Sequence, residues 1–290
     1  MLWQVSCGAN SVKQEKGTMT EQHIAGTIGI LGAGWLGLPL ARALLAAGKQ
    51  VAVTVSSAEK AARLQGEGIA AHPLTISAHM SDAWPIPCES LVICVPPSKT
   101  DDYPQAVAKA CQLAKASGTR RVLFVSATSV WGAGQEEGEL PKPRHARGER
   151  MLAAEQAVLA AGFETVMIVR PSGLYGPDRH PGRFLAGKTL DGGAQSVNLV
   201  HLDDVVAACM LLLERGKDGD VFNLSAPVHP RREQFYPFAA RQQGLPVPVF
   251  IEPAGEFQPI DGQLICQQMG FNYRWPDPAH WFAELAASGN

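Results

Sequence analysis

The fold is decided by residues 27–37, which read Thr-Ile-Gly-Ile-Leu-Gly-Ala-Gly-Trp-Leu-Gly. The first five residues form a short apolar run typical of a buried strand, and the last six match the pattern G-x-G-x-x-G. Residues 38–47 continue with helical spacing up to a glycine, and residues 51–55 form a run rich in β-branched side chains. A strand, a glycine-rich turn, a helix and a second strand in this order predict a βαβ unit.

Each glycine of this pattern has a physical role in binding a dinucleotide. Gly32 permits a tight turn, Gly34 lets the backbone approach a pyrophosphate, and Gly37 allows the helix to pack closely against the strand. The start of the helix adds unpaired N–H donors and about half a positive charge. We therefore expect a dinucleotide cofactor to contact Gly32, Gly34, Trp35, Leu36 and Gly37.

The end of the second strand indicates which dinucleotide is bound. Sites that prefer NAD usually place a carboxylate about 20 residues after the glycine pattern, where it binds the ribose 2′-hydroxyl. Here that turn carries Ser56, Ser57 and Lys60, and we predict that these side chains hold the 2′-phosphate of NADP(H). NAD(H) is the alternative if Lys60 is only a solvated helix charge. We also expect Val95 and Pro96, at the end of a later apolar run, to border the cofactor.

Apolar runs and helical segments continue to alternate along the chain. Further predicted strands cover residues 91–95, 121–125, 165–169 and 221–224, and predicted helices cover residues 101–116, 149–161 and 205–214. We expect the helices to be capped by Asp101 or Asp102 and by Asp203 or Asp204. The predicted fold class is α/β, a doubly wound parallel Rossmann sheet with a small C-terminal substrate lobe.

The same pattern divides the chain into regions. Residues 27–172 are expected to form the dinucleotide-binding domain, completed by residues 196–226, and residues 173–195 and 227–290 to form the substrate lobe. Residues 1–26 lack the apolar core of a signal peptide, and we expect them to be a disordered extension.

Composition excludes several classes of partner. The 290 residues carry 25 Lys and Arg against 27 Asp and Glu, and this net charge of −2 gives no electrostatic reason to expect nucleic acid or an anionic membrane as partner. No run reaches the ~18 apolar residues that a membrane helix needs. The six cysteines are scattered without metal-ligand spacing, so we expect no metal site and a reducing, cytoplasmic setting.

Three further segments resemble one enzyme superfamily. Residues 122–132, VLFVSATSVWG, are similar to its S-S-x-x-V-Y-G signature, residues 169–177, VRPSGLYGP, to its R-P-x-x-x-Y-G-P turn, and residues 200–205, VHLDDV, to its V-H-V-D-D-V segment. The chain thus resembles the extended or atypical short-chain dehydrogenases/reductases, the NAD(P)-dependent epimerase/dehydratase family, and within it a bacterial branch. The resemblance implies NAD(P) chemistry on a small-molecule substrate.

The catalytic residues of that family are not matched here. The family uses a Ser or Thr together with Y-x-x-x-K, in which the Lys lowers the pKa of the Tyr for proton transfer. In this chain Ala127 stands at the hydroxyl position. The Tyr and Lys positions align with Arg147 and Met151, or with Ala146 and Arg150 after a shift of one residue.

Four side chains are candidates to replace the missing catalytic groups. Ser126 or Thr128 could supply the hydroxyl, although hydroxyls at strand ends often bond only to the backbone. Arg147 or Arg150 could polarise a carbonyl or hold an anionic substrate. The alternative is that both arginines are surface charges balanced by Glu149.

Positive charge gathers in the loop that follows the R-P-x-x-x-Y-G-P turn. In the family that this chain resembles, this loop faces the substrate cleft, so we infer a phosphorylated or carboxylated ligand, with a solvated loop as the alternative. The expected substrate contacts are Tyr175, Arg179, His180 and Arg183. His201 is expected to be a structural hydrogen-bonding group between the two lobes.

These observations lead to two functional hypotheses of different classes. The first is an NADP(H)-dependent oxidoreductase or epimerase-like enzyme acting on a small polar, anionic carbonyl or sugar derivative. The second is a non-catalytic NAD(P)H-binding sensor or regulator that kept the phosphate site and lost Y-x-x-x-K. A β-hydroxyacid dehydrogenase would also fit the first glycine-rich unit, but the segments at residues 169–177 and 200–205 argue against it.

Overall fold

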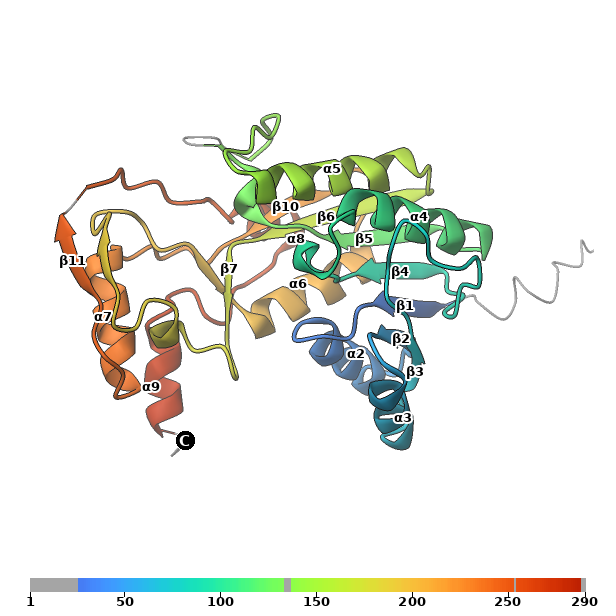
Figure 1. Ribbon diagram of the computed structural model, residues 1–290, viewed down its shortest axis with the longest axis horizontal. Coiled ribbons are helices and arrows are strands. Elements are labelled where there is room, and N and C mark those ends of the chain that lie inside the picture. Colours follow the sequence, from blue (N-terminus) through green and yellow to red (C-terminus); the bar gives the residue numbers. More distant parts are fainter. Residues whose placement is uncertain (1–25, 133–136, 253, 288–290) are drawn as a thin grey trace, which may run out of the picture.

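The computed structural model describes residues 26–132, 137–252 and 254–287. The centre of this described part is a seven-stranded sheet in the order β10-β6-β5-β4-β1-β2-β3, with every neighbouring pair parallel (Figure 1). The strands are β1 (Thr27–Leu31), β2 (Gln50–Val55), β3 (Ala70–Pro73), β4 (Ser90–Ile93), β5 (Arg121–Val125), β6 (Thr165–Pro171) and β10 (Val221–Leu224). The predicted α/β class and the doubly wound parallel sheet are confirmed.

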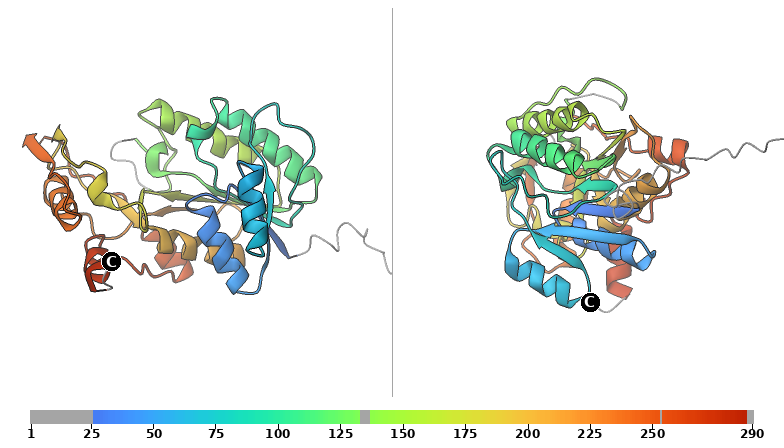
Figure 2. Two further views of the ribbon diagram at one scale, coloured as in Figure 1. Left: turned by 60° about the horizontal axis from the view of Figure 1, so that its bottom comes forward. Right: turned by 90° about the vertical axis from the view of Figure 1, so that its right-hand side faces the viewer.

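Helices cover both faces of this sheet, as Figures 1 and 2 show. On one face lie α2 (Gly37–Ala46), α3 (Ala58–Gly66) and α6 (Leu202–Arg215), and on the other lie α4 (Tyr103–Ala116) and α5 (Ala146–Ala160). Each face has its own apolar core, with Leu40 and Val205 in the first and Val107 and Met151 in the second. Because helices cover both faces, β4 is buried at every position.

The order of the strands reverses at β1. This strand pairs with β2 on one side and with β4 on the other, so the chain winds in opposite directions from it. In open α/β sheets the ligand crevice lies outside the carboxyl ends of the strands at such a reversal. The glycine-rich turn follows β1 directly at this point.

A small lobe lies beyond the carboxyl ends of the strands, at the left of Figure 1. It contains the paired strands β7 (Gly173–Tyr175) and β9 (Leu199–His201), the paired strands β8 (Thr189–Asp191) and β11 (Val249–Glu252), the 3-10 turn η3 (Pro181–Arg183), and helices α7 (Arg232–Gln242) and α9 (His280–Ala287). Tyr175, Phe235 and Trp281 pack together in its core. Helix α8 (Leu264–Met269) returns to the sheet, where Ile265 joins the core beside α6.

The expected cap of α6 is wrong. Helix α6 begins after His201, whose Nδ1 accepts the N–H of Asp203 at 3.1 Å, so His201 is the capping residue. Asp204 instead accepts the N–H groups of Arg274 at 2.6 Å and Trp275 at 3.2 Å, which fixes the C-terminal segment to the start of the helix. His201 is thus a structural group between the two lobes, as we expected from the sequence.

The side-chain cap expected for α4 is also absent. Asp102 precedes the helix immediately, but its carboxylate accepts the N–H of Ala78 at 2.9 Å and the hydroxyl of Thr100. The carboxylate therefore holds the loop before β4. Sequence position identified the residue at the helix start, but not the partner that its side chain reaches.

Candidate functional site

The three glycines after β1 have different surroundings. Gly32 adopts a φ of 97°, a value that side-chain-bearing residues rarely tolerate, and its N–H donates to Thr54 Oγ1 at 3.0 Å. A Cβ atom on Gly37 would lie 2.3 Å from the carbonyl oxygen of Gly32, so only glycine lets α2 approach the turn. A Cβ on Gly34 would meet no atom within 4 Å. This open space above the start of α2 fits a pyrophosphate.

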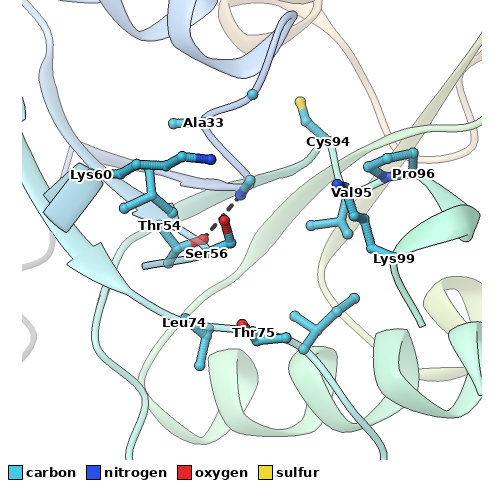
Figure 3. Close-up of a pocket in the computed structure, with 14 residues that line it drawn as sticks. Ala33, Thr54, Ser56, Lys60, Leu74, Thr75, Cys94, Val95, Pro96 and Lys99 are labelled. Atoms are coloured by element: carbon cyan, nitrogen blue, oxygen red, sulfur yellow. Dashed lines mark hydrogen bonds between the residues drawn. The ribbon is translucent and has the colours of Figure 1, made fainter. Parts of the chain in front are cut away.

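A cleft of about 220 Å³ opens beside this turn, at the ends of β1, β2, β3 and β4 (Figure 3). It has an apolar floor, which includes Leu74, Ile76 and Val95. Lys60 on α3 and Lys99 after β4 line it from opposite sides (Figure 3). No carboxylate lines it among the described residues, so its charged groups would attract an anion.

The structure brings six of the ten expected cofactor contacts to this cleft, namely Gly32, Gly34, Ser56, Lys60, Val95 and Pro96. The hydroxyl of Ser57 instead accepts the N–H of Lys60 at 3.3 Å and caps α3. Trp35, Leu36 and Gly37 lie outside the lining: Leu36 packs into the core, and Trp35 contacts the lobe.

Sequence reasoning missed four polar or sulfur-bearing residues of the lining, namely Thr54, Thr75, Cys94 and Lys99. Each lies at or after the carboxyl end of β2, β3 or β4. Strand order would have pointed to these positions, because neighbouring parallel strands end at one edge of the sheet. Lys99 lies in the 3-10 turn η1 (Pro97–Lys99), three residues beyond the expected Pro96.

Ser126, one of the candidate hydroxyls, belongs to a buried network. Its Oγ donates to Glu155 Oε1 at 2.5 Å, and Glu155 forms a two-pronged ion pair with Arg170 at 3.0 and 2.7 Å. The side chains of Glu155 and Arg170 are only 2% and 8% exposed. The Arg170 guanidinium also lies 4.6 Å from the centre of the Trp131 ring. The Ser126 hydroxyl thus donates to a buried carboxylate.

Thr128 and Arg147 lie at a close contact between two elements. Thr128 begins the 3-10 turn η2 (Thr128–Val130) after β5, and Arg147 lies in the first turn of α5. Between them, a Cβ on Gly148 would lie 2.1 Å from the carbonyl oxygen of Ser129. Only a glycine lets α5 pack this closely against η2. In the described structure the Thr128 hydroxyl has no hydrogen-bond partner.

Arg150, one turn further along α5, forms hydrogen bonds with backbone carbonyl oxygens. Its Nη2 donates to the carbonyl oxygens of Pro97 at 2.9 Å and Thr100 at 2.5 Å. It therefore fixes the segment after β4, which borders the cleft. Tyr103 supports the same segment, because its hydroxyl donates to the carbonyl oxygen of Val95 at 2.7 Å.

The four expected substrate contacts separate into two groups. Tyr175 is fully buried in the core of the lobe, where its ring packs against His201 and Trp281, and burial raises the pKa of its hydroxyl. His180 is 5% exposed and stacks on Trp281, and burial, together with the charge of Arg183, lowers its pKa to about 4. Tyr175 and His180 thus stabilise the lobe.

Arg179 and Arg183 are exposed. The Arg179 guanidinium lies 5.3 Å from the centre of the Trp35 ring, directly above the glycine-rich turn. Partial burial lowers the pKa of Arg179, and the charge of Arg147 lowers it further. The structure thus places Arg179 beside Trp35 of the glycine-rich turn.

Within the described ranges, no three His, Cys, Asp or Glu side chains come together as metal ligands. No described helix combines the length and the apolar character needed to cross a membrane.

Comparison with known proteins identifies the family. The NAD dependent epimerase/dehydratase family matches residues 102–225, and the family of NADP oxidoreductases that are coenzyme F420-dependent matches residues 27–118. Protein YeeZ of Escherichia coli strain K12 is 39% identical over 268 residues, which cover 87% of this chain and 97% of YeeZ.

Solved structures agree on the fold. A putative NAD-dependent epimerase/dehydratase from Methylobacillus flagellatus is 24% identical and superimposes with a TM-score of 0.72, covering 91% of this chain and 99% of that chain. A UDP-glucuronic acid 4-epimerase from Bacillus cereus, solved in complex with NAD, is 17% identical with a TM-score of 0.70, covering 89% and 99%. The chain belongs to the same family as protein YeeZ of Escherichia coli, and its residues 102–225 match the NAD dependent epimerase/dehydratase family.

Proposed function

We propose that this protein is an NADP(H)-dependent oxidoreductase or epimerase-like enzyme that acts on a small, polar, anionic carbonyl or sugar derivative. The observation that carries the proposal is the cleft beside the glycine-rich turn. It combines open space above Gly34 with two lysines, and no described carboxylate lines it. Such a site fits a dinucleotide whose ribose carries an additional phosphate.

The preference for NADP(H) over NAD(H) rests on the second strand. A carboxylate after this strand would bind the 2′-hydroxyl of NAD and repel a 2′-phosphate. Here Ser56 and Lys60 line the cleft at that place, and Lys99 lies across from them. By contrast, Arg63 is 68% exposed and lies 3.9 Å from Glu67, as a solvated helix charge would. The match of residues 27–118 to an NADP-dependent family also supports this preference.

The chemical step depends on residues of β5 and α5. When bound, the nicotinamide would exchange a hydride with the substrate. Arg147 would stabilise negative charge developing on the substrate oxygen, but an arginine keeps its protons and does not supply one. Thr128, whose hydroxyl has no partner in the described part of the chain, would pass the proton between substrate and solvent. Ser126 and Arg150 would act indirectly, by positioning β5 and the segment after β4.

Cofactor titration tests the proposal. Binding of NADPH and NADH is measured by fluorescence for the wild-type protein, for Lys60→Ala and, as a matched control, for Arg63→Ala. Loss of one charge-assisted contact costs ~1.5–3 kcal/mol, so Lys60→Ala should weaken NADPH binding about 10- to 100-fold and leave NADH binding unchanged. Tighter binding of NADH than of NADPH to the wild-type protein contradicts the assignment.

Turnover is tested separately. NADPH oxidation is followed with a panel of ketones, aldehydes and nucleotide sugars, of which the acidic members should be the best substrates. Thr128→Val and Arg147→Gln should each lower kcat, because they remove the proposed proton route and the proposed charge stabilisation. Unchanged kcat in both variants would exclude these roles.

A second candidate is a cofactor-binding sensor without turnover. It is favoured by the positions of the tyrosines. Tyr175 is buried in the lobe, Tyr103 and Tyr273 donate to backbone carbonyl oxygens, and Tyr236 packs against Phe235. None of these tyrosines lines the cofactor cleft, so none replaces the family's catalytic tyrosine. Tight NADPH binding with no turnover across the whole panel would favour the sensor.

A further inference from the structure

The small lobe reaches towards the Rossmann domain through a tight turn after β7. Gly176 and Arg179 pair across this turn, since the N–H of Arg179 donates to the carbonyl oxygen of Gly176 at 3.0 Å and the N–H of Gly176 donates to that of Arg179 at 3.4 Å. Pro177 and Asp178 lie between them, and Asp178 has a φ of 62°. A proline followed by a residue of positive φ is typical of a type II turn. Residues 176–179, the lobe turn, therefore have a defined shape.

The base of the lobe turn is fixed, and its tip projects from the lobe. Gly176 is buried, and a Cβ atom on it would lie 3.1 Å from Nε2 of His201. His180, which follows the turn, is 5% exposed and stacks on Trp281 in the lobe core. Residues 177–179 are exposed by contrast. The tip can therefore contact the Rossmann domain while its base stays in the lobe.

The tip of the lobe turn contacts Trp35 in two ways. The indole N–H of Trp35 donates to the carbonyl oxygen of Pro177 at 2.9 Å, across 142 positions of sequence. The Arg179 guanidinium lies 5.3 Å from the centre of the same indole ring, within the ~6 Å of a cation–π contact. One contact fixes the edge of the ring and the other fixes its face. Rotation of the indole would therefore break at least one of them.

This contact is the link between the lobe and the half of the molecule that forms the cofactor cleft. Residues 26–99 contain β1 to β4, and the hydrogen bond of Trp35 is the only one that joins them to the described residues of the lobe, 173–195, 227–252 and 254–287. The other hydrogen bonds of the lobe to the Rossmann domain include those of Asp204 on α6 and Asn223 on β10. Both of these residues lie in the opposite half of the sheet or its helices.

The position of Trp35 connects this contact with ligand binding. Trp35 directly follows Gly34, where a Cβ atom would meet no atom within 4 Å and where the proposed function places the pyrophosphate. A ligand in that space restricts the backbone that carries the indole, and the indole holds the lobe turn. Once one of the two turns is ordered, ordering the other costs less conformational entropy.

We infer that the side chain of Trp35 is a latch between the glycine-rich turn and the lobe turn, through which a ligand at Gly34 rigidifies residues 176–179. The inference rests on the proposed function only for the position of that ligand. It goes beyond that function because it assigns a conformational role to a side chain that does not line the cofactor cleft. By linkage, the closed latch raises the affinity for the ligand by the same factor by which the ligand stabilises the closed latch.

Hydrogen exchange of the ligand-free protein tests the latch directly. Exchange is followed by mass spectrometry in peptides that cover residues 176–183, for the wild-type protein, Trp35→Phe and the matched control Trp84→Phe. Trp35→Phe keeps an aromatic ring but removes the N–H donor, so exchange in the lobe turn should become about three- to tenfold faster. The Trp84 indole also donates to a backbone carbonyl oxygen, that of Ile86 at 3.0 Å, but in the core on the other face of the sheet. Trp84→Phe should therefore leave exchange in the lobe turn unchanged.

Arg179→Met provides a second test that leaves Trp35 in place. It removes the cation from the face of the indole and keeps a side chain of similar length, so exchange in the lobe turn should become about two- to fivefold faster. Circular dichroism and thermal unfolding establish which variants fold. Wild-type exchange in a folded Trp35→Phe overturns the inference. If Trp35→Phe does not fold, wild-type exchange in Arg179→Met overturns it.

The effect of a ligand is tested with NADPH. Saturating NADPH should slow exchange in the lobe turn of the wild-type protein about fivefold or more. In Trp35→Phe, with saturation followed by NADPH fluorescence, exchange in the lobe turn should stay unchanged. Equal slowing in both proteins would mean that NADPH acts on the lobe turn without Trp35, and it overturns the inference. If NADPH does not bind to the wild-type protein, the proposed function fails, whereas exchange in the ligand-free protein still decides whether the latch exists.

Discussion

Gly34 and Gly37 lie in the same turn, but an added methyl group meets different surroundings at each position. At Gly34 it enters open space, whereas at Gly37 it would lie 2.3 Å from a backbone oxygen. Gly34→Ala should therefore leave the free energy of unfolding unchanged and abolish NADPH binding, because the methyl group occupies the space proposed for the pyrophosphate.

The measurements are urea unfolding and NADPH titration of the same preparations. Gly37→Ala is the matched control and should show the opposite pattern, with a lower free energy of unfolding because α2 must shift away from the turn. Wild-type NADPH affinity in Gly34→Ala would contradict the placement of the cofactor.

The Glu155–Arg170 pair is the best-buried ion pair in the described ranges. Glu155→Ala would leave the Arg170 guanidinium without a carboxylate and the Ser126 hydroxyl without an acceptor. Removing one partner of a buried pair costs ~3–5 kcal/mol, which urea unfolding would detect. Glu164→Ala is the control, since Glu164 pairs with Arg120 on the surface, and it should cause no measurable change. An equal change in the free energy of unfolding in both variants would mean that the buried ion pair contributes no more than the surface ion pair.

At the scale of elements, Gly148 sets the position of a whole helix. A methyl group on it would lie 2.1 Å from the carbonyl oxygen of Ser129, so Gly148→Ala should move the start of α5 away from η2. We expect kcat to fall as much as in Arg147→Gln, because Arg147 moves with the helix.

The control for the Gly148→Ala prediction is the same substitution at a glycine in a different helix. Gly66, the last residue of α3, would gain a methyl group that meets no atom within 4 Å, so Gly66→Ala should have the kcat of the wild-type protein. Circular dichroism of both variants shows whether helix content is kept. An undiminished kcat in Gly148→Ala would show that the role of Arg147 does not depend on the position of the helix.

The order and type of the Rossmann elements could be predicted because strands buried on both faces leave unbroken apolar runs. Their ends could not be predicted as well. Helix α5 begins at Ala146, three residues before the expected start, because its first turn is stabilised by packing at Gly148 and not by a strong local signal. The cap of α6 was misassigned because two aspartates match the usual pattern, while His201, held by rings of the lobe, reaches the free N–H.

At the scale of the whole molecule, acid should weaken the lobe first. Burial lowers the pKa of His180 to about 4, and it also lowers the pKa of His201. These pKa values lie below the unfolded value of 6.5, so both groups stabilise the fold above pH 6.5, and this contribution is lost as the pH falls towards 4. Asp204 and Glu137 oppose this in part, because burial raises their pKa values to about 6 and about 7, and their protonation favours the folded state.

The free energy of unfolding should thus fall between pH 6.5 and 4, and the fluorescence of Trp275 and Trp281, which pack against His201, should report it. His180→Asn keeps a group that can accept the N–H of Gly182 but does not titrate, so its stability should depend less steeply on pH. The same slope in wild type and variant would assign the acid sensitivity to other groups.

The sequence could locate the cofactor cleft because a single local motif determines it. It could not predict which side chains of the expected substrate loop are buried in the lobe and which are exposed. Tyr175, Arg179 and His180 are close neighbours in sequence, yet the turn at Asp178 sends Arg179 towards Trp35 and leaves the two rings in the lobe core. Nor could spacing reveal that Arg179 lies over Trp35, because their contact depends on how the lobe sits on the sheet.

Arg150 connects the segment after β4 with the start of helix α5. Its guanidinium holds the backbone after β4, which borders the cleft, and it lies one turn beyond Arg147 on the same helix. We therefore expect a ligand that orders the backbone after β4 also to order the start of α5. By thermodynamic linkage, the factor by which a ligand in the cleft raises the affinity for a second ligand at α5 equals the factor by which the second ligand raises the affinity for the first.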